Sequence, residues 1–173
     1  KGPIFLGLEL WQWIGLGLII LIFWLVIIIS KVIFKQIIAR FGQMPRYKDF
    51  LELETTQKLS KALSRLVAFF FLNVFIPALQ LSPEITANIL IAVNIGAVIY
   101  FMSFLFLLTE LSGIYLVKMA KNTESTMDDQ FVPVIKKIIK LIIFVSGTIV
   151  VLRILNVNVT AVIAGVSIGG LAF

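Results

Sequence analysis

The chain has 173 residues, of which 60% are hydrophobic and only 14% are charged. This composition excludes a soluble globular domain, in which about 25% of residues are charged, and predicts an integral membrane protein with several spans. The absence of His and Cys from the sequence excludes disulfides, thiol catalysis, histidine-based acid–base chemistry and the common zinc sites. The net charge of +6 is explained by where the basic residues lie, and we expect no nucleic acid partner.

The first predicted span is the uncharged run 10–30, which ends before Lys31. At 1.5 Å per residue, this run is long enough to cross a hydrocarbon core of about 30 Å. Trp11 and Trp13 lie at one end and Lys31 and Lys35 at the other, as expected of residues at the two membrane interfaces. The length of the run, without a small-residue cleavage site after it, excludes a signal peptide.

Two further apolar runs follow, separated from the first by a polar connection at residues 41–59. The second run covers residues 66–83 and contains Pro77, which removes the donor that would bond the carbonyl of Asn73. We therefore expect a kink near this proline. After a short turn, the third run covers residues 85–109 and is long enough to span with tilt.

A second polar connection, at residues 110–130, leads to a fourth helix. Residues 128–129, both Asp, offer carboxylates that cap a helix start, and Pro133 is tolerated in a first turn. The fourth helix is expected to begin near these carboxylates and to reach about Leu155. Residues 156–160 then form a tight turn into a fifth helix.

The basic residues set the topology. If both polar connections are cytoplasmic, every Lys and Arg lies inside except Lys1 and Arg153. The positive-inside rule therefore predicts an all-α membrane protein with five transmembrane helices, its amino end outside and its carboxyl end inside. We expect a multi-pass protein of the cell inner (plasma) membrane.

No group of residues suits catalysis, so we expect no enzyme activity, no cofactor and no metal. Asp128 and Asp129 are the only paired carboxylates. Adjacent residues on a helix point about 100° apart, so this pair does not make an acid–base dyad. A helix cap is the favoured interpretation.

Three lysines near the start of the fourth helix have two interpretations. These lysines are Lys136, Lys137 and Lys140. They either anchor the helix at the inner interface or contact anionic lipid headgroups. Arg153, near the other end of this helix, is expected to reach outward or to pair with an oxygen acceptor.

The last stretch is uncharged, and small residues recur in it at helical spacing. The face predicted to line a pore carries Thr160, Ala164, Ser167 and Leu171. The residues predicted to pack against a neighbouring helix are Ala161, Gly165, Gly169 and Gly170. Small residues let helices approach closely in lipid, which suits either a pore helix or a tightly packed helix of a transporter bundle.

The last 50 or so residues resemble the mechanosensitive channel of small conductance family. The resemblance lies in residues 128–130 (Asp-Asp-Gln), 132–133 (Val-Pro), the turn 156–160 and the run 169–172 (Gly-Gly-Leu-Ala). Five helices look like the longer members of that family. The chain ends at Phe173 inside an apolar run, so we expect that a C-terminal part is missing.

This resemblance implies a homo-oligomer of seven identical subunits with a central pore lined by the last helix. Residues 1–125 then form three peripheral transmembrane helices, and residues 126–173 form a helix hairpin that includes the pore helix. Gly170 and Leu171 fall at an apolar constriction, and Ala161, Gly165 and Gly169 fall at the seam between neighbouring pore helices. Members of the family continue into a cytoplasmic domain that contains β-structure.

The expected function is a mechanosensitive ion channel that membrane tension opens, releasing ions and small solutes on hypo-osmotic shock. Its partners are identical subunits and membrane lipids. A secondary transporter subunit is the alternative, which predicts polar binding groups at the midplane and internal repeats. Only Asn73 and Asn94 offer such groups. A membrane anchor is a third possibility, for which the glycine-rich end has no use.

Overall fold

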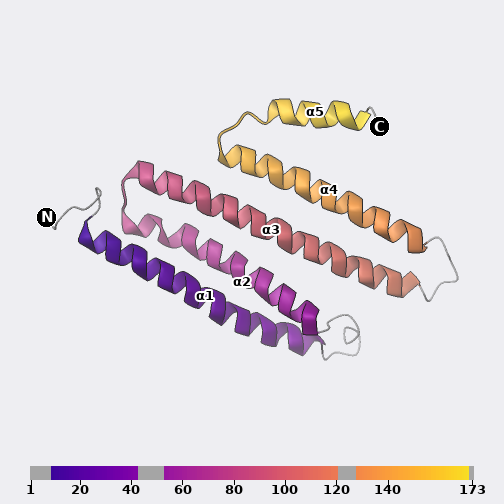
Figure 1. Cartoon of the computed structure of the whole chain (residues 1–173), viewed down its shortest axis with the longest axis horizontal. Coiled ribbons are helices and arrows are strands. Elements are labelled where there is room, and N and C mark those ends of the chain that lie inside the picture. Colours follow the sequence, from indigo (N-terminus) through magenta and orange to yellow (C-terminus); the bar gives the residue numbers. More distant parts are fainter. Residues whose placement is uncertain (1–8, 43–52, 121–127, 172–173) are drawn as a thin grey trace.

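The computed structural model of the chain describes residues 9–42, 53–120 and 128–171, and its regular elements in these ranges are all helical. These elements are α1 (Leu10–Gly42), α2 (Leu53–Phe75), the 3-10 helix η1 (Pro77–Leu79), α3 (Pro83–Ala120), α4 (Asp128–Ile154) and α5 (Thr160–Leu171). Figure 1 shows α1 to α4 side by side in chain order, each antiparallel to the one before, with α5 turned back after α4. The arrangement is an up-and-down layer of long helices.

Three helices in the described ranges are long and apolar enough to cross a membrane, and they cover Leu10–Arg40, Glu54–Leu79 and Pro83–Ile114. The prediction that the first three apolar runs belong to helices able to span is thus confirmed, although the helices have other bounds than the runs. α4 carries Lys137, Lys140 and Arg153, which shorten its uncharged stretch. α5 has 12 residues, or about 18 Å, against a hydrocarbon core of about 30 Å. Membrane crossing by α4 and α5 stays a prediction.

The helices extend further than the apolar runs. α3 continues through Glu110 to Ala120, so the prediction that a connection begins at Glu110 is wrong. One carboxylate does not end a helix, and residues 110–120 contain no proline. Similarly, α1 reaches Gly42 and α2 already begins at Leu53. Only residues 43–52 and 121–127 of the predicted connections lie outside the described residues.

The predicted bounds of the fourth helix are confirmed, since α4 begins at Asp128 and ends at Ile154. Pro133, however, lies in the second turn of α4 and not in the first. A proline there lacks the N–H that would bond the carbonyl of Asp129, four residues back. The side chains of residues 128–130, including any capping by Asp128 or Asp129, lie outside the description.

Pro77 ends α2 instead of kinking a continuous helix. The helix stops at Phe75, and the chain tightens into η1, in which the Gln80 N–H donates to the Pro77 carbonyl at 3.1 Å. Gln80 then takes a left-handed conformation with φ of 47°, which turns the chain toward α3. The predicted break is therefore correct in place, and its geometry is that of a helix end.

The start of α1, the end of α2 and the start of α3 are joined by a small core. Ile19, Leu79 and Leu81 are buried together there. Beside them, the buried side chain of Gln12 donates from Nε2 to the carbonyl of Gln80 at 3.1 Å. This hydrogen bond attaches the start of α1 to the turn between α2 and α3.

Phe69 of α2 links the middle of the same three helices. Its ring meets Phe23 of α1 edge-on at 5.8 Å between centroids and lies 5.2 Å from the ring of Tyr100 of α3. It also occupies the space that a side chain at Gly96 of α3 would need. Gly96 therefore allows α2 and α3 to approach closely around one aromatic ring.

Candidate functional site

The turn that leads into α5 is built on two asparagines. Asn156 has φ of 57°, its N–H donates to the Arg153 carbonyl at 3.0 Å, and the Val157 N–H donates to the Leu152 carbonyl at 2.9 Å. This pair of bonds is a Schellman motif, which ends a helix on a residue in the left-handed conformation. Asparagine adopts that conformation more readily than most residues, so residue 156 both ends α4 and reverses the chain.

Asn158 starts the next helix. Its Oδ1 accepts a hydrogen bond from the Thr160 N–H at 3.0 Å, and the Ile163 N–H donates to the Val159 carbonyl at 2.9 Å. The asparagine side chain thus satisfies an amide at the start of α5 that has no partner inside the helix. The tight turn predicted for residues 156–160 is confirmed, with a separate role for each asparagine.

α5 presents its small residues to open space in the single chain. Thr160, Ala164 and Ser167 of the predicted pore face are exposed. Of the predicted packing residues, Ala161 and all three glycines are also exposed, and a Cβ added at Gly165, Gly169 or Gly170 meets nothing within 4 Å. α5 includes Leu171, whose side chain lies outside the description. Which face lines a pore and which packs stays a prediction.

α4, which carries this turn, is attached to α3 by a three-residue ion cluster. Lys136 Nζ lies 2.7 Å from Oε2 of Glu110, and Lys140 binds the other oxygen of the same carboxylate. Lys137 points elsewhere and is exposed. Of the three lysines considered for lipid contact, two therefore have a carboxylate partner within the chain.

Sequence reasoning missed Glu110 as the partner of these lysines. The carboxylate lies 26 residues before Lys136 and 30 before Lys140, so helical spacing gives no signal for the pairing. A usable signal was the isolated acidic residue at the end of an apolar run. A charge in that position usually has a partner on a neighbouring helix.

Two glycines let α3 and α4 approach closely on either side of this cluster. A Cβ on Gly113 of α3 would overlap the aliphatic stem of Lys136, and a Cβ on Gly147 of α4 would overlap Met102. Each glycine therefore accepts a long side chain from the opposite helix. The stem of Lys136 packs on α3 while its ammonium group binds Glu110.

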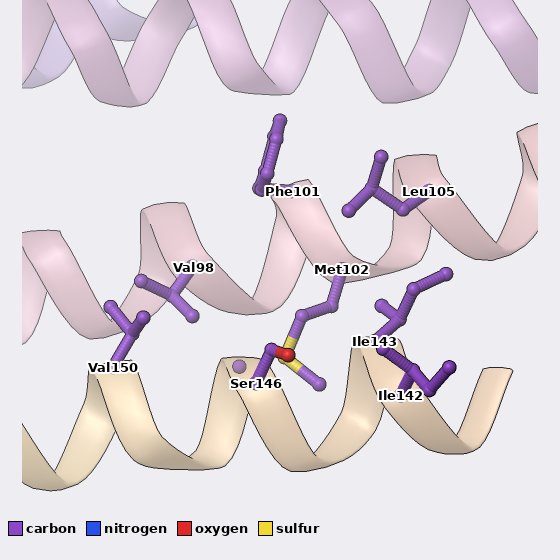
Figure 2. A pocket seen from close by; sticks show the side chains of 9 residues that line it. Val98, Phe101, Met102, Leu105, Ile142, Ile143, Ser146 and Val150 are labelled. Atoms are coloured by element: carbon purple, nitrogen blue, oxygen red, sulfur yellow. The ribbon is translucent and has the colours of Figure 1, made fainter. Parts of the chain in front are cut away.

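An apolar cavity of about 370 Å³ lies between α3 and α4. Figure 2 shows Met102 of α3 extending toward Ser146 of α4, with Phe101 and Leu105 along the α3 side. The lining is almost wholly hydrocarbon, and the Ser146 hydroxyl is the one polar side chain among the lining residues, none of which is charged. Its place between two packed helices makes it part of their contact.

Arg153 lies exposed in the last turn of α4. A cation there interacts favourably with the negative end of the helix dipole. Asn73, one of the two amides that the transporter alternative would use, donates from Nδ2 to the Phe69 carbonyl of its own helix at 3.2 Å. Among the described residues, no three Asp or Glu side chains lie together as metal ligands would.

The chain is similar to two curated proteins of Methanocaldococcus jannaschii. It is 32% identical over 147 residues to the large-conductance mechanosensitive channel MscMJLR, an alignment that covers 80% of this chain and 39% of the relative. It is 31% identical over 58 residues to the small-conductance mechanosensitive channel MscMJ, covering 34% of this chain and 17% of that relative. No family model matches the chain, and no solved structure matches it.

The chain spans about two fifths of the length of the first relative and a smaller share of the second. The first alignment reaches well beyond the last 50 or so residues, because those residues alone cannot make up 80% of the chain. Wherever an alignment of this length begins, it includes α2 and α3, so the similarity is not confined to the α4–α5 hairpin.

Proposed function

This chain belongs to the mechanosensitive channel family, and we propose that it forms the membrane part of a channel that membrane tension opens. The channel releases ions and small solutes on hypo-osmotic shock and lies in the cell inner membrane. The observation that carries the proposal is α5, an uncharged helix of small residues whose described side chains are exposed in the single chain. Such a helix gains its packing from other copies.

The proposed assembly is a ring of identical subunits, seven by the resemblance, with α5 innermost. Thr160, Ala164, Ser167 and Leu171 face the lumen in this arrangement. Ala161, Gly165, Gly169 and Gly170 face the next subunit, where open space at the three glycines leaves room for another backbone. α1 to α3 lie outside this ring, in contact with lipid.

The proposed gate is a ring of Leu171 side chains. A narrow apolar ring loses its water and blocks ions without any charged group. If the open ring occupies more membrane area than the closed ring, tension shifts the equilibrium toward opening without a ligand. Smooth contacts between small residues allow neighbouring α5 helices to slide during that change.

Among the three lysines considered for lipid contact, we propose Lys137 as the residue that meets the headgroups. Its side chain is exposed on α4, whereas Lys136 and Lys140 share the carboxylate of Glu110. An ammonium group at the inner interface is attracted by anionic lipids within about a Debye length.

The test is current recording from liposome patches that contain the purified protein. Suction is expected to open steps of current that are absent from protein-free patches and that require no added transport substrate. A transporter would instead give solute-dependent uptake without tension. Silence up to the pressure at which patches rupture, with the protein demonstrably in the bilayer, would contradict the proposal.

A further inference from the structure

A second cavity, of about 290 Å³, lies between α2 and α3 and is lined by cations, and we call it the basic pocket. α2 contributes Lys58, Lys61 and Arg65. These positions are i, i+3 and i+7, which places all three on one helix face. The facing residues of α3 are Tyr100, Ser103 and Leu107, which have the same spacing and form the opposite wall.

Most of the charge in the basic pocket is uncompensated. Lys58 pairs with Glu54 one turn earlier, at 2.6 Å, in an exposed pair of the kind that contributes little. Lys61 and Arg65 have no carboxylate partner within the described part of the chain. This contrasts with Lys136 and Lys140 of α4, whose charge Glu110 offsets.

Tyr100 holds the guanidinium of Arg65 in place. The Arg65 Cζ lies 5.1 Å from the centroid of the Tyr100 ring, which is a cation–π contact. The Ser103 hydroxyl donates to the Ile99 carbonyl at 2.9 Å, so it has no proton to offer a ligand. Recognition in the basic pocket therefore rests on the cations.

In the topology predicted from the basic residues, the pocket lies at the inner boundary of the membrane. The uncharged part of α2 begins directly after Arg65, and Lys58 lies about 10 Å nearer the cytoplasmic side along the helix axis. Ala62 and Leu107 add apolar surface to the same cavity. Its cations thus run from the edge of the hydrocarbon through the headgroup layer.

We propose that the basic pocket binds the headgroup of an anionic phospholipid of the inner leaflet. The phosphate accepts hydrogen bonds from Arg65 and Lys61, and the acyl chains continue past Tyr100 along the uncharged part of α2. A soluble phosphate would gain nothing from this apolar surface, whereas a lipid uses both the cations and the apolar surface. The inference concerns α2 and α3 alone and does not depend on α5 lining a pore.

The test is lipid binding by native mass spectrometry of the detergent-solubilised chain, titrated with dioleoyl phosphatidylglycerol and, separately, with dioleoyl phosphatidylcholine. The anionic lipid is expected to bind at least about fivefold more tightly. Lys61→Gln and Arg65→Gln are each expected to lower that affinity about fivefold, as removal of one cation near the membrane surface predicts. Both side chains are exposed, so the variants retain the fold.

The matched control is Lys35→Gln, which removes an exposed cation of α1 outside the pocket and is expected to leave lipid affinity unchanged. An equal loss in this control would overturn the proposal by showing general attraction to charge. Displacement of the lipid by equimolar glycerol phosphate would also overturn it, in favour of a site for soluble phosphate. Equal affinity for the two lipids would also overturn the proposal. Channel recordings play no part in the measurement.

Discussion

Lys136 Nζ lies 2.7 Å from Oε2 of Glu110, and this contact joins the first half of α4 to the second half of α3. Lys140 binds the second oxygen of the carboxylate, so one acidic group holds two turns of α4. α4 in turn ends in the tight turn that carries α5. In the proposed channel, a force that lipid exerts on α3 therefore reaches α5 through this ion cluster and this turn.

Replacing Glu110 with Gln is expected to raise the tension needed for opening. The change removes the charge that holds Lys136 and Lys140, so α3 transmits less of its movement to α4. Because the Glu110 side chain is 43% exposed, the loss of stability is expected to be small, about 1 kcal/mol or less. The measurement is the opening pressure in excised patches, relative to that of a co-reconstituted reference channel.

Glu84→Gln is the matched control for this variant. It removes an exposed carboxylate from the other end of α3, where no described cation binds it. An unchanged opening pressure in Glu110→Gln, or an equal rise in Glu84→Gln, would show that the ion cluster does not transmit force.

Gly147→Leu is expected to separate α3 from α4. Even a Cβ at this position overlaps Met102, and overpacking of this kind costs about 1–3 kcal/mol. The midpoint of thermal unfolding in detergent should fall, and adding Met102→Ala should restore part of the loss by making room. Gly17→Leu provides the comparison, because a Cβ there meets nothing within 4 Å. If Met102→Ala restored none of the stability lost in Gly147→Leu, the overlap with Met102 would not be the cause of the loss.

Much of the hairpin was predictable because its signals are local. The start of α4 at Asp128, its end at Ile154 and the turn that follows depend on residues within a few positions of one another. The ion cluster at Glu110 was not predictable, since its members lie on different helices and periodicity reports only which residues share a face. The length of α3 was underestimated for a related reason: an apolar run reports the thickness of the hydrocarbon core, whereas a helix continues into water as long as its residues favour it.

The candidate site was predictable only in part. Helical spacing separates the two faces of α5, but the choice between lumen and neighbour depends on other copies of the chain, which no intrachain contact reveals. The basic pocket was not predictable, because in the sequence Lys58, Lys61 and Arg65 have the positions of ordinary positive-inside residues. Only the structure places Tyr100 of α3 against Arg65.

Asn156→Val is expected to destabilise the α4–α5 turn by about 1–2 kcal/mol. A β-branched side chain is strained at φ of 57°, whereas Gly accepts this conformation freely. Asn156→Gly should therefore match or slightly exceed the wild-type midpoint of thermal unfolding. Equal midpoints for the Val and Gly variants would show that the left-handed residue is not needed.

Gly165→Leu and Gly169→Leu are expected to raise the opening tension while leaving the stability of the isolated chain unchanged. A Cβ at either position meets nothing within 4 Å among the described residues, so we expect any effect to come from contacts with other subunits. Leucine side chains would interlock across the seam and resist sliding. Ile168→Leu, at an exposed position of the same helix, tests whether any change of shape in α5 has this effect. Opening pressures equal to wild type in both glycine variants would remove the seam from the proposed mechanism.

Leu171→Ser is expected to make the channel open at lower tension or conduct at rest. The proposed gate excludes ions because a ring of leucines is too apolar to hold water, and a hydroxyl in each subunit would wet the constriction. The measurements are the resting current of liposome patches and the survival of expressing cells after transfer to dilute medium. Leu18→Ser is the control, since it places the same change on an exposed face of α1, away from any proposed pore. Resting current and survival indistinguishable from those of the Leu18 variant would mean that Leu171 does not form the gate, and the constriction would then lie at another residue.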